Sequence, residues 1–404
     1  MIIKLAWRNI WRNKRRTGIT LGSIFFAVIL SVFMMSIKEG VYDNMIKSSA
    51  GDFSGYAQVH LKGYWDDRSF DYAFDVSDSL VEAIEANTNI SGYLPRIESF
   101  ALVAGDEITK GSMVIGIDPE KEKAYTKLHE RVVEGTYFTD NASQILIGQG
   151  LAEYLKVGVN DTLVLLGSGY MGMTAVGKYS IAGIVKFGSP ELSNRLVFLP
   201  MEAADYFFAS NGLVTSIILQ CKDGDAGRLA AQTLGQKLGD EYEVMDWIQL
   251  NPELLQMIET DRVEGYVFMF ILYLVIGFGI FGTMLMMLVE RAREFGVLIA
   301  VGMKRMKLAF MVWFEVLTLS ILGAILGIIG AFPLCLYFNI NPIRYSEEMA
   351  QIAEEYGIEA VLRASLDPGI FIQQAVVIAI MASVIAIYPF FKLTRINAVE
   401  SMRS

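Results

Sequence analysis

The sequence predicts an α+β membrane protein, in which four transmembrane helices carry a large mixed α/β extracytoplasmic domain between helices 1 and 2. Three observations predict this fold class. Apolar residues make up 53% of the 404 residues and collect in long runs, as membrane helices require. Basic residues collect in three short segments, and a long acidic stretch combines strand-like and helix-like patterns.

Each of the four apolar runs is long enough to cross a hydrocarbon core of about 30 Å. The first carries no charge and is longer than the apolar part of a cleaved signal peptide, so we interpret it as an uncleaved anchor. The third is longer than a bilayer requires and contains Glu315, which we expect near the cytoplasmic interface. The predicted transmembrane helices are 17–37, 265–289, 308–338 and 370–391.

Lysine and arginine in the short flanks set the orientation of these helices. The segments 1–16, 290–307 and 392–404 together carry 14 basic and 3 acidic residues. The stretch 38–264 carries 18 basic and 34 acidic residues, and the loop 339–369 carries 2 basic and 6 acidic. Since the three basic segments share one side of a four-helix chain, we expect cytoplasmic termini and an external domain at 38–264.

The external domain is predicted to contain two packed subdomains, reached through helical stalks that extend the first two membrane helices. Strand-like runs rich in β-branched residues lie at 56–61, 112–117, 162–166, 180–185, 196–199 and 214–220. Helical patterns lie at 77–86 and 226–238. The aromatic segment 51–75 has two interpretations, an exposed loop that contacts a partner or an acyl chain, and ordinary packing into the domain, which we prefer.

Few residues offer catalytic or metal-binding chemistry. The only histidines are His60 and His129, and two isolated cysteines fit no disulfide framework or zinc spacing. The run 172–178 matches most of a phosphate-binding loop, but Tyr179 occupies the position of the hydroxyl that reaches Mg²⁺. We therefore expect a glycine-rich hairpin there, and no catalytic, cofactor or metal site in this chain.

Two further patterns concern the membrane. A repeated W-R-N places Trp7 over Trp11 and Arg8 over Arg12 on a helix, which favours an amphipathic element in the headgroup layer. Glycines four residues apart allow close helix packing and weakly favour a dimer, although such spacing is common by chance in membrane helices. These glycines are Gly18, Gly22, Gly323 and Gly327.

A short apolar helix is predicted between the second and third membrane helices, within 290–307. It is framed by Gly296 and Gly302 and flanked by charged residues. An apolar helix of this kind on the cytoplasmic face is suited to docking in a groove of a soluble partner.

These parts resemble the FtsX-like permease superfamily of ABC transporters over essentially the whole chain. Residues 290–302, ERAREFGVLIAVG, are similar to the family's E-R-x-R-E-I-G-x-x-[RK]-A-x-G, with Ile299 at the usual basic position. Residues 388–400 are similar to its closing Y-P-x-x-[RK]-A-x-x-[LI]-x-P-V-E, with Ala398 at the usual proline. The superfamily contains macrolide-exporter and lipoprotein-releasing permeases, with a MacB-like periplasmic core domain.

The resemblance implies that 290–307 is a coupling helix that inserts into a separate ATPase, which binds the ATP and Mg²⁺. It implies a dimer of permeases with a cytoplasmic ATPase dimer in a bacterial inner membrane. Motion would pass through membrane helices 1 and 2 into the periplasmic domain, so this chain itself is expected not to be an enzyme. The residues expected to couple are Glu290, Arg291, Arg293, Glu294, Phe295, Gly296, Val297, Leu298, Ala300, Gly302 and Lys304.

The external motifs favour the lipoprotein-releasing branch, although the same motif order occurs in exporters. These motifs lie at 94–100, 116–119, 134–138 and 147–161. Lipoprotein release is therefore the preferred function. Export of amphiphiles or peptides is the second choice, regulation of a cell-wall hydrolase the third, and a membrane-bound enzyme the last. The remaining expected partners are a second permease, identical or similar, membrane lipids, lipoproteins and a periplasmic acceptor, with no nucleic acid.

Overall fold

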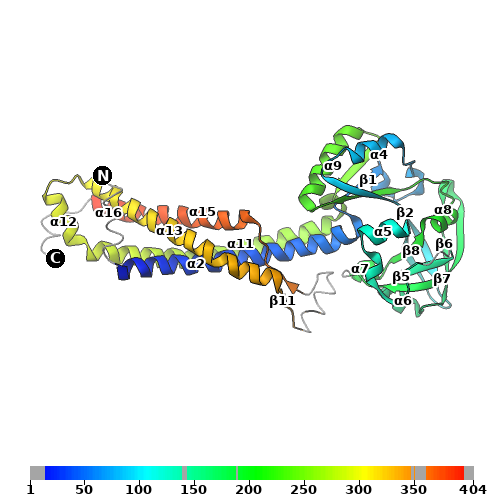
Figure 1. The fold of residues 1–404 in the computed structure, drawn as a ribbon, viewed down its shortest axis with the longest axis horizontal. Helices are drawn as coiled ribbons and strands as arrows, with labels where there is room; N and C mark the ends of the chain where they lie inside the picture. The colour runs from blue at the N-terminus through cyan, green and yellow to red at the C-terminus, as the bar shows by residue number, and fades with distance from the viewer. Residues whose placement is uncertain (1–13, 139–142, 188–189, 347–349, 351–360, 395–404) are drawn as a thin grey trace. The chain divides into compact units, whose positions relative to one another are not determined.

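The computed structural model describes residues 14–138, 143–187, 190–346, 350 and 361–394. The chain divides into a helical unit, formed by 1–42, 258–343 and 361–404, and a mixed α/β unit, formed by 43–257 and 344–360 (Figure 1). Among the described residues, four helices are long and apolar enough to cross a membrane. The predicted fold class is therefore confirmed.

The helices of the helical unit are α2 (Lys14–Ile46), α11 (Pro252–Glu290), α12 (Ala292–Ala300), α13 (Arg305–Ile340), α15 (Pro368–Ile385) and α16 (Ile387–Thr394). Residues 43–46 of α2 and 252–257 of α11 already belong to the mixed unit. Two of these helices continue well past their apolar runs. Helix α2 has 33 residues and α11 has 39, which at about 1.5 Å per residue is longer than a hydrocarbon core. Polar contacts hold these continuations together: Lys38 Nζ lies 3.0 Å from Asp261 Oδ2, and Arg262 Nη2 lies 3.1 Å from Glu39 Oε2.

The mixed unit is built around a ten-stranded sheet, six strands of which close into a barrel in the order β2-β3-β8-β5-β7-β6, with β6 pairing again with β2. The strands are β1 (Ala57–Leu61), β2 (Ile90–Ala104), β3 (Thr109–Ile117), β4 (Val132–Gly135), β5 (Gln144–Gly148), β6 (Thr162–Ser168), β7 (Thr174–Val185), β8 (Leu196–Pro200), β9 (Ser216–Cys221) and β10 (Tyr242–Asp246). Short strands β11 (Ile343–Arg344) and β12 (Val361–Leu362) lie outside this sheet.

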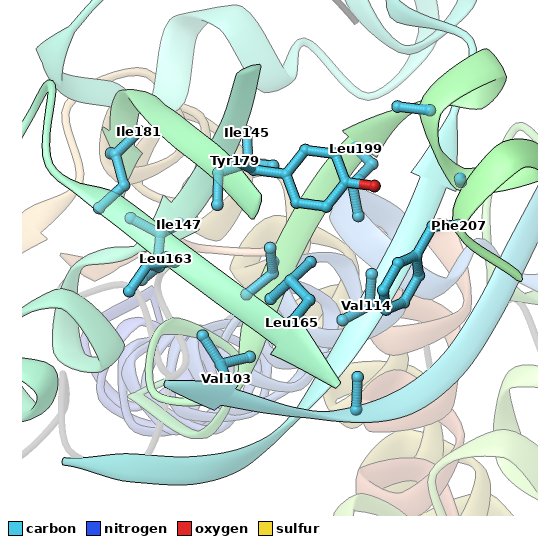
Figure 2. Close-up of a cluster of buried hydrophobic side chains, with 14 of the residues drawn as sticks. Val103, Val114, Ile145, Ile147, Leu163, Leu165, Tyr179, Ile181, Leu199 and Phe207 are labelled. Atoms are coloured by element: carbon cyan, nitrogen blue, oxygen red, sulfur yellow. The ribbon is translucent and has the colours of Figure 1, made fainter. Parts of the chain in front are cut away.

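The barrel interior is apolar because alternate residues of each strand point inward. Figure 2 shows side chains from β2, β3, β5, β6, β7 and β8 converging, with Phe207 of α8 (Met201–Phe208) beside them. Short helices and turns connect the strands. They are η1 (Lys47–Ser54), α3 (Tyr64–Asp67), η2 (Phe70–Tyr72), α5 (Pro119–Tyr125), η3 (Leu128–Arg131), α6 (Gln149–Leu155), η4 (Tyr170–Gly172), α7 (Pro190–Ser193) and α10 (Trp247–Leu250).

A second core lies where α4 (Asp78–Glu85) and α9 (Gly224–Leu238) pack on β1, β9 and β10 (Figure 1). Strand β2 joins the two cores, because its first half pairs with β9 and its second half with β3 and β6. The mixed unit is thus one compact unit with two apolar cores that share a long strand, and the division into two subdomains stays a prediction.

All six predicted strand-like runs overlap strands, whereas β2, β4, β5 and β10 of the ten-stranded sheet were not among the predicted runs. In β2, Pro95, Arg96 and Glu98 interrupt the apolar alternation, and the burial of Arg96 and Glu98 could not be read from the sequence. The aromatic segment 51–75 packs into the domain, as preferred: Tyr64 is 1% exposed, and Phe70 and Phe74 are 5% exposed. The glycine-rich run 172–178 belongs to the β6–β7 hairpin, also as predicted: residues 169–173 connect the strands, and β7 begins at Thr174.

Candidate functional site

The segment between α11 and α13 forms a helical corner at one end of the helical unit (Figure 1). Helix α11 ends at Glu290, and Arg291 leaves helical geometry with φ −105° and ψ 6° before α12 begins. After α12 ends at Ala300, Gly302 takes φ +102°, a conformation that glycine adopts without steric cost. Lys304, in extended geometry, then precedes the first residue of α13.

The inward side of α12 is apolar, with Phe295 and Gly296 buried. Phe295 is 0% exposed and lies in a cluster with residues of α11, α13, α15–α16 and their junctions. The cluster consists of Met284, Met287, Leu288, Phe295, Leu308, Ala309, Met311, Val312, Val316, Ala386 and Leu393. Phe295 therefore ties α12 to an apolar cluster to which α11, α13 and α16 also contribute.

The outward side of α12 combines charged and apolar side chains. Arg293, Val297, Ala300 and Lys304 are all exposed, and their spacing of three to four residues places the three residues on α12 along one stripe. Val297 is 47% exposed and Val301 is 82% exposed. A helix with one buried face and an opposite face of small apolar and basic residues can enter a groove of a soluble protein.

A buried ion pair fixes the start of α12 to α13. Arg291 Nη1 lies 2.9 Å and 3.1 Å from the two carboxylate oxygens of Glu315, and Arg291 Nε donates to Glu294 Oε2 at 3.1 Å. Glu315 is 0% exposed and Arg291 is 5% exposed. Glu315 thus lies near the corner, beneath α12, with its carboxylate neutralised by a residue of the predicted coupling segment.

The structure sorts the predicted coupling residues into two sides. Arg291, Phe295 and Gly296 are buried, and Leu298 is half-buried. The exposed ones are Glu290, Arg293, Glu294, Val297, Ala300, Gly302 and Lys304. Sequence reasoning grouped both sides together and did not pair Arg291 with Glu315. The available signal was one acidic residue in an apolar run, which needs a basic partner in a low-dielectric surrounding.

The predicted packing glycines behave differently from one another. A Cβ on Gly323 would lie 2.7 Å from Ile24, and one on Gly327 would lie 2.5 Å from Val28, so α13 approaches α2 closely at both positions. Gly18 and Gly22 have no neighbouring atom within 4 Å of such a Cβ. The four interface residues Trp7, Arg8, Trp11 and Arg12 lie outside the described residues.

The described residues include few side chains that could serve in catalysis or bind a metal. No group of three His, Cys, Asp or Glu side chains is placed there to hold a metal ion. Cys221 and Cys335 are buried and unpaired with each other, and burial raises the pKa of the Cys221 thiol to about 11. A thiol that stays protonated at neutral pH is a poor nucleophile.

Comparison with known families identifies two matching domains. Residues 17–237 match the MacB-like periplasmic core domain, and residues 266–398 match the FtsX-like permease C-terminal domain. The two matches together cover most of the chain.

Individual relatives match the chain at low identity. A pyoverdine export ATP-binding/permease protein PvdT of Pseudomonas aeruginosa is 24% identical over 358 residues, which is 83% of this chain and 50% of that protein. A macrolide export ATP-binding/permease protein MacB of Rhodopseudomonas palustris is 30% identical over 159 residues, 38% of this chain and 24% of that protein. The chain therefore spans about half the length, or less, of these relatives.

Solved structures of similar domains also match part of the chain. The periplasmic region of MacB from Actinobacillus actinomycetemcomitans is 12% identical, with a TM-score of 0.35, and covers 53% of this chain and 97% of that one. The extracellular domain of the ABC-type transporter YknZ from Gram-positive bacteria is 14% identical, with a TM-score of 0.32, over 47% of this chain and 98% of that one.

Proposed function

This chain belongs to the family in which a MacB-like periplasmic core domain is joined to an FtsX-like permease domain, and we propose that it is the permease subunit of an ABC transporter. In this proposal a separate cytoplasmic ATPase binds ATP and Mg²⁺. The chain itself transmits the resulting motion from α12 through the membrane helices into its external domain.

The observation that carries this proposal is the two-sided geometry of α12. Its inward side is locked to the membrane helices by Phe295 and by the Arg291–Glu315 pair, while its outward stripe is exposed. A helix that is exposed on one side and firmly seated on the other can receive a push from a partner and pass it on. The basic flanks support a cytoplasmic position for this corner and for both termini.

We propose a dimer of such chains, or a pair with a similar permease, in a bacterial inner membrane. Gly18 is exposed and Gly22 is half-buried, and no atom lies within 4 Å of a Cβ built on either one, so this stripe of α2 has room for a second helix. Gly323 and Gly327 already serve the contact between α13 and α2 within one chain, so they support the fold of the monomer and not the dimer.

For the transported class we propose lipoproteins, taken from the inner membrane for delivery to the outer membrane through a periplasmic acceptor. The external motifs of the lipoprotein-releasing type support this choice. Export of amphiphiles or peptides is the second candidate, and the names of the relatives, macrolide and pyoverdine exporters, favour it. Regulation of a cell-wall hydrolase is the third.

Affinity purification of the tagged chain in mild detergent, followed by mass spectrometry, tests the proposal. A soluble ATPase with a second four-helix permease and acylated proteins would support lipoprotein release. An ATPase with a periplasmic adaptor would support export, and one with a hydrolase would support regulation. Absence of any ATPase from repeated preparations would overturn the permease assignment.

A further inference from the structure

Helix α2 is continued at its C-terminal end by an unusual type of helix. The residues that follow it without a break, Lys47–Ser54, form the π-helix η1. Gly55 then takes φ +71° and turns the chain toward β1. π-Helical segments are rare in proteins, and those that do occur often lie at functional sites. The last carbonyls of any helix lack partners within it, so inside a folded domain they need outside donors.

Two buried side chains of the sheet supply these donors. Arg96 of β2 donates from Nη1 to the carbonyl of Phe53 at 2.9 Å, and Gln58 of β1 donates from Nε2 to the carbonyl of Ser54 at 2.6 Å. Arg96 is 1% exposed and Gln58 is 3% exposed. A positive charge at a helix C-terminus also interacts favourably with the helix dipole.

The guanidinium of Arg96 is itself held rigidly. Glu122 of α5 accepts from Nε at 2.7 Å and from Nη2 at 3.2 Å, and a carboxylate oxygen of Glu98 lies 3.7 Å from Nη1. Burial alone would lower the pKa of Arg96, but the charges and hydrogen bonds of Glu122 and then Glu98 raise it above its usual value. Thr126 donates in turn to Glu122 at 2.6 Å. Such a bidentate pair fixes the orientation of the arginine fork.

The side chain of Phe53 makes aromatic contacts of its own. Its ring lies edge-on to Phe187 and Phe198, with ring centroids 5.7 Å and 6.4 Å away. Both belong to the apolar cluster against the outer side of the barrel. The Arg96 guanidinium carbon lies 5.3 Å from the centre of the Phe53 ring. The end of η1 is therefore bound through its backbone to the sheet and through its side chain to the barrel.

A buried ion pair alone is weak support for a special role, because apolar residues often replace such pairs without loss. Here an apolar residue at 96 would leave the Phe53 carbonyl without its hydrogen-bond donor. It would also leave the buried carboxylates of Glu122 and Glu98 without the guanidinium. We propose that Arg96 is a positioning residue that fixes the end of the helix formed by α2 and η1 to the barrel, so that movement of this helix is passed to the external domain. This inference rests on the proposed permease function.

Arg96→Lys tests the proposal in the full chain, reconstituted in nanodiscs with the ATPase that copurifies. Lysine keeps the positive charge beside Glu122, but one ammonium group cannot reproduce the fork and also reach Phe53. Hydrogen exchange of amides 50–54 should become on the order of tenfold faster, as expected for loss of a charge-assisted hydrogen bond, while β3 and β8 keep wild-type exchange. ATPase stimulation should persist, and the ATP-dependent change of exchange in the external domain should disappear.

Arg228→Lys, at an exposed position of α9, is the matched control and should behave as wild type. Wild-type exchange at 50–54 in Arg96→Lys, or a retained ATP-dependent change in the external domain, would overturn the proposal. If Arg96→Lys speeds exchange throughout the barrel, Gln58→Met becomes the deciding variant, because it removes the second donor without removing a charge. Unchanged exchange at 50–54 in Gln58→Met would reject the proposed attachment of η1 to the sheet, which we call the joint.

The two proposals fail separately. If no ATPase accompanies the wild-type chain, the permease function fails, whereas exchange at 50–54 still reports whether Arg96 holds η1. If the ATPase is present and stimulated but the external domain responds normally in Arg96→Lys, only the positioning role of Arg96 fails.

Discussion

The two units of the molecule each contain a buried arginine–glutamate pair beside the end of a helix, and the two pairs differ in geometry. In the mixed unit, Arg96 presents two nitrogens to two oxygens of Glu122. In the helical unit, one nitrogen of Arg291 is shared between both oxygens of Glu315, and Arg291 also contacts Glu294, whose side chain is 45% exposed.

The difference indicates two mechanical roles. The carboxylate partners of Arg96, Glu122 and Glu98, are both buried, so the end of η1 that Arg96 binds is held in one arrangement. Arg291 has a buried partner and an exposed one, so the start of α12 is tied to α13 while remaining within reach of a change at the surface. Helix α12, which is proposed to dock to the ATPase, has to respond to that partner. The contact between Arg96 and η1, which is proposed to pass motion to the external domain, has to stay rigid.

The largest expected effect is loss of the enclosed pair. Arg96→Met leaves Glu122 and Glu98 buried without their cation, which should lower the free energy of unfolding of the mixed unit by about 3–5 kcal/mol. The measurement is hydrogen exchange of β2 and β9 amides in the full chain. A loss below about 1 kcal/mol would show that water reaches these carboxylates, and that the joint is not enclosed.

A somewhat smaller effect is expected at the other pair. Arg291→Met should cost roughly 2–4 kcal/mol in thermal unfolding of the detergent-solubilised chain, since the buried Glu315 loses the guanidinium that contacts both of its carboxylate oxygens. Adding Glu315→Leu should recover most of the loss, because an apolar pair leaves no buried charge. The corresponding double variant Arg96→Met/Glu122→Leu should recover much less, since Glu98 and the Phe53 carbonyl stay unsatisfied. Equal recovery in both units would remove the distinction between them.

Acid should weaken the mixed unit through His60. This side chain is 0% exposed, its Nε2 lies 2.8 Å from Gln58 Oε1, and burial, followed by the charge of Arg68, lowers its pKa to about 3. Between pH 6.5 and 3 the unfolded chain therefore binds a proton that the folded chain does not. Stability is full above about pH 6.5 and falls as the pH decreases, by about 2 kcal/mol at pH 5.

Hydrogen exchange of β1 amides at pH-corrected rates measures this dependence. His60→Gln should remove most of it, whereas His129→Gln, a matched change at a partly exposed histidine, should not. Both histidines of the chain belong to the mixed unit, so the helical unit should lack this histidine-driven acid response. An unchanged slope in His60→Gln would mean that another group carries it.

The smallest effect on stability is expected on the outward face of α12. Val297→Asp should change the free energy of unfolding by less than about 0.5 kcal/mol, because the side chain is 47% exposed. It should nevertheless abolish copurification of the ATPase, since a carboxylate would enter the docked apolar stripe. Phe295→Ala, on the buried face, is the contrasting variant: it should cost about 3–5 kcal/mol in stability. Normal ATPase recovery with Val297→Asp would place the docking surface elsewhere.

Much of the fold followed from the sequence because it depends on properties that are local along the chain. Four apolar runs determined the number of membrane helices, and β-branched runs located strands such as β3, β7 and β9. The corner at Gly302 was foreseen for a similar reason, since glycine next to a short apolar helix is a local signal. Four strands of the ten-stranded sheet, β2, β4, β5 and β10, were not among the predicted runs. In β2 the reason is that Arg96 and Glu98 are buried, whereas the pattern assumes that charged residues face water.

The sequence by itself therefore determined the four apolar helices, the acidic α/β domain between the first two, and the segment on which the proposed function rests. Only the tertiary structure decided which of its residues face outward, and that Arg291 pairs with Glu315 and Arg96 with Glu122. These partners lie 24 and 26 positions apart. A charge becomes buried only when separate elements close around it, and no local pattern records which elements those will be.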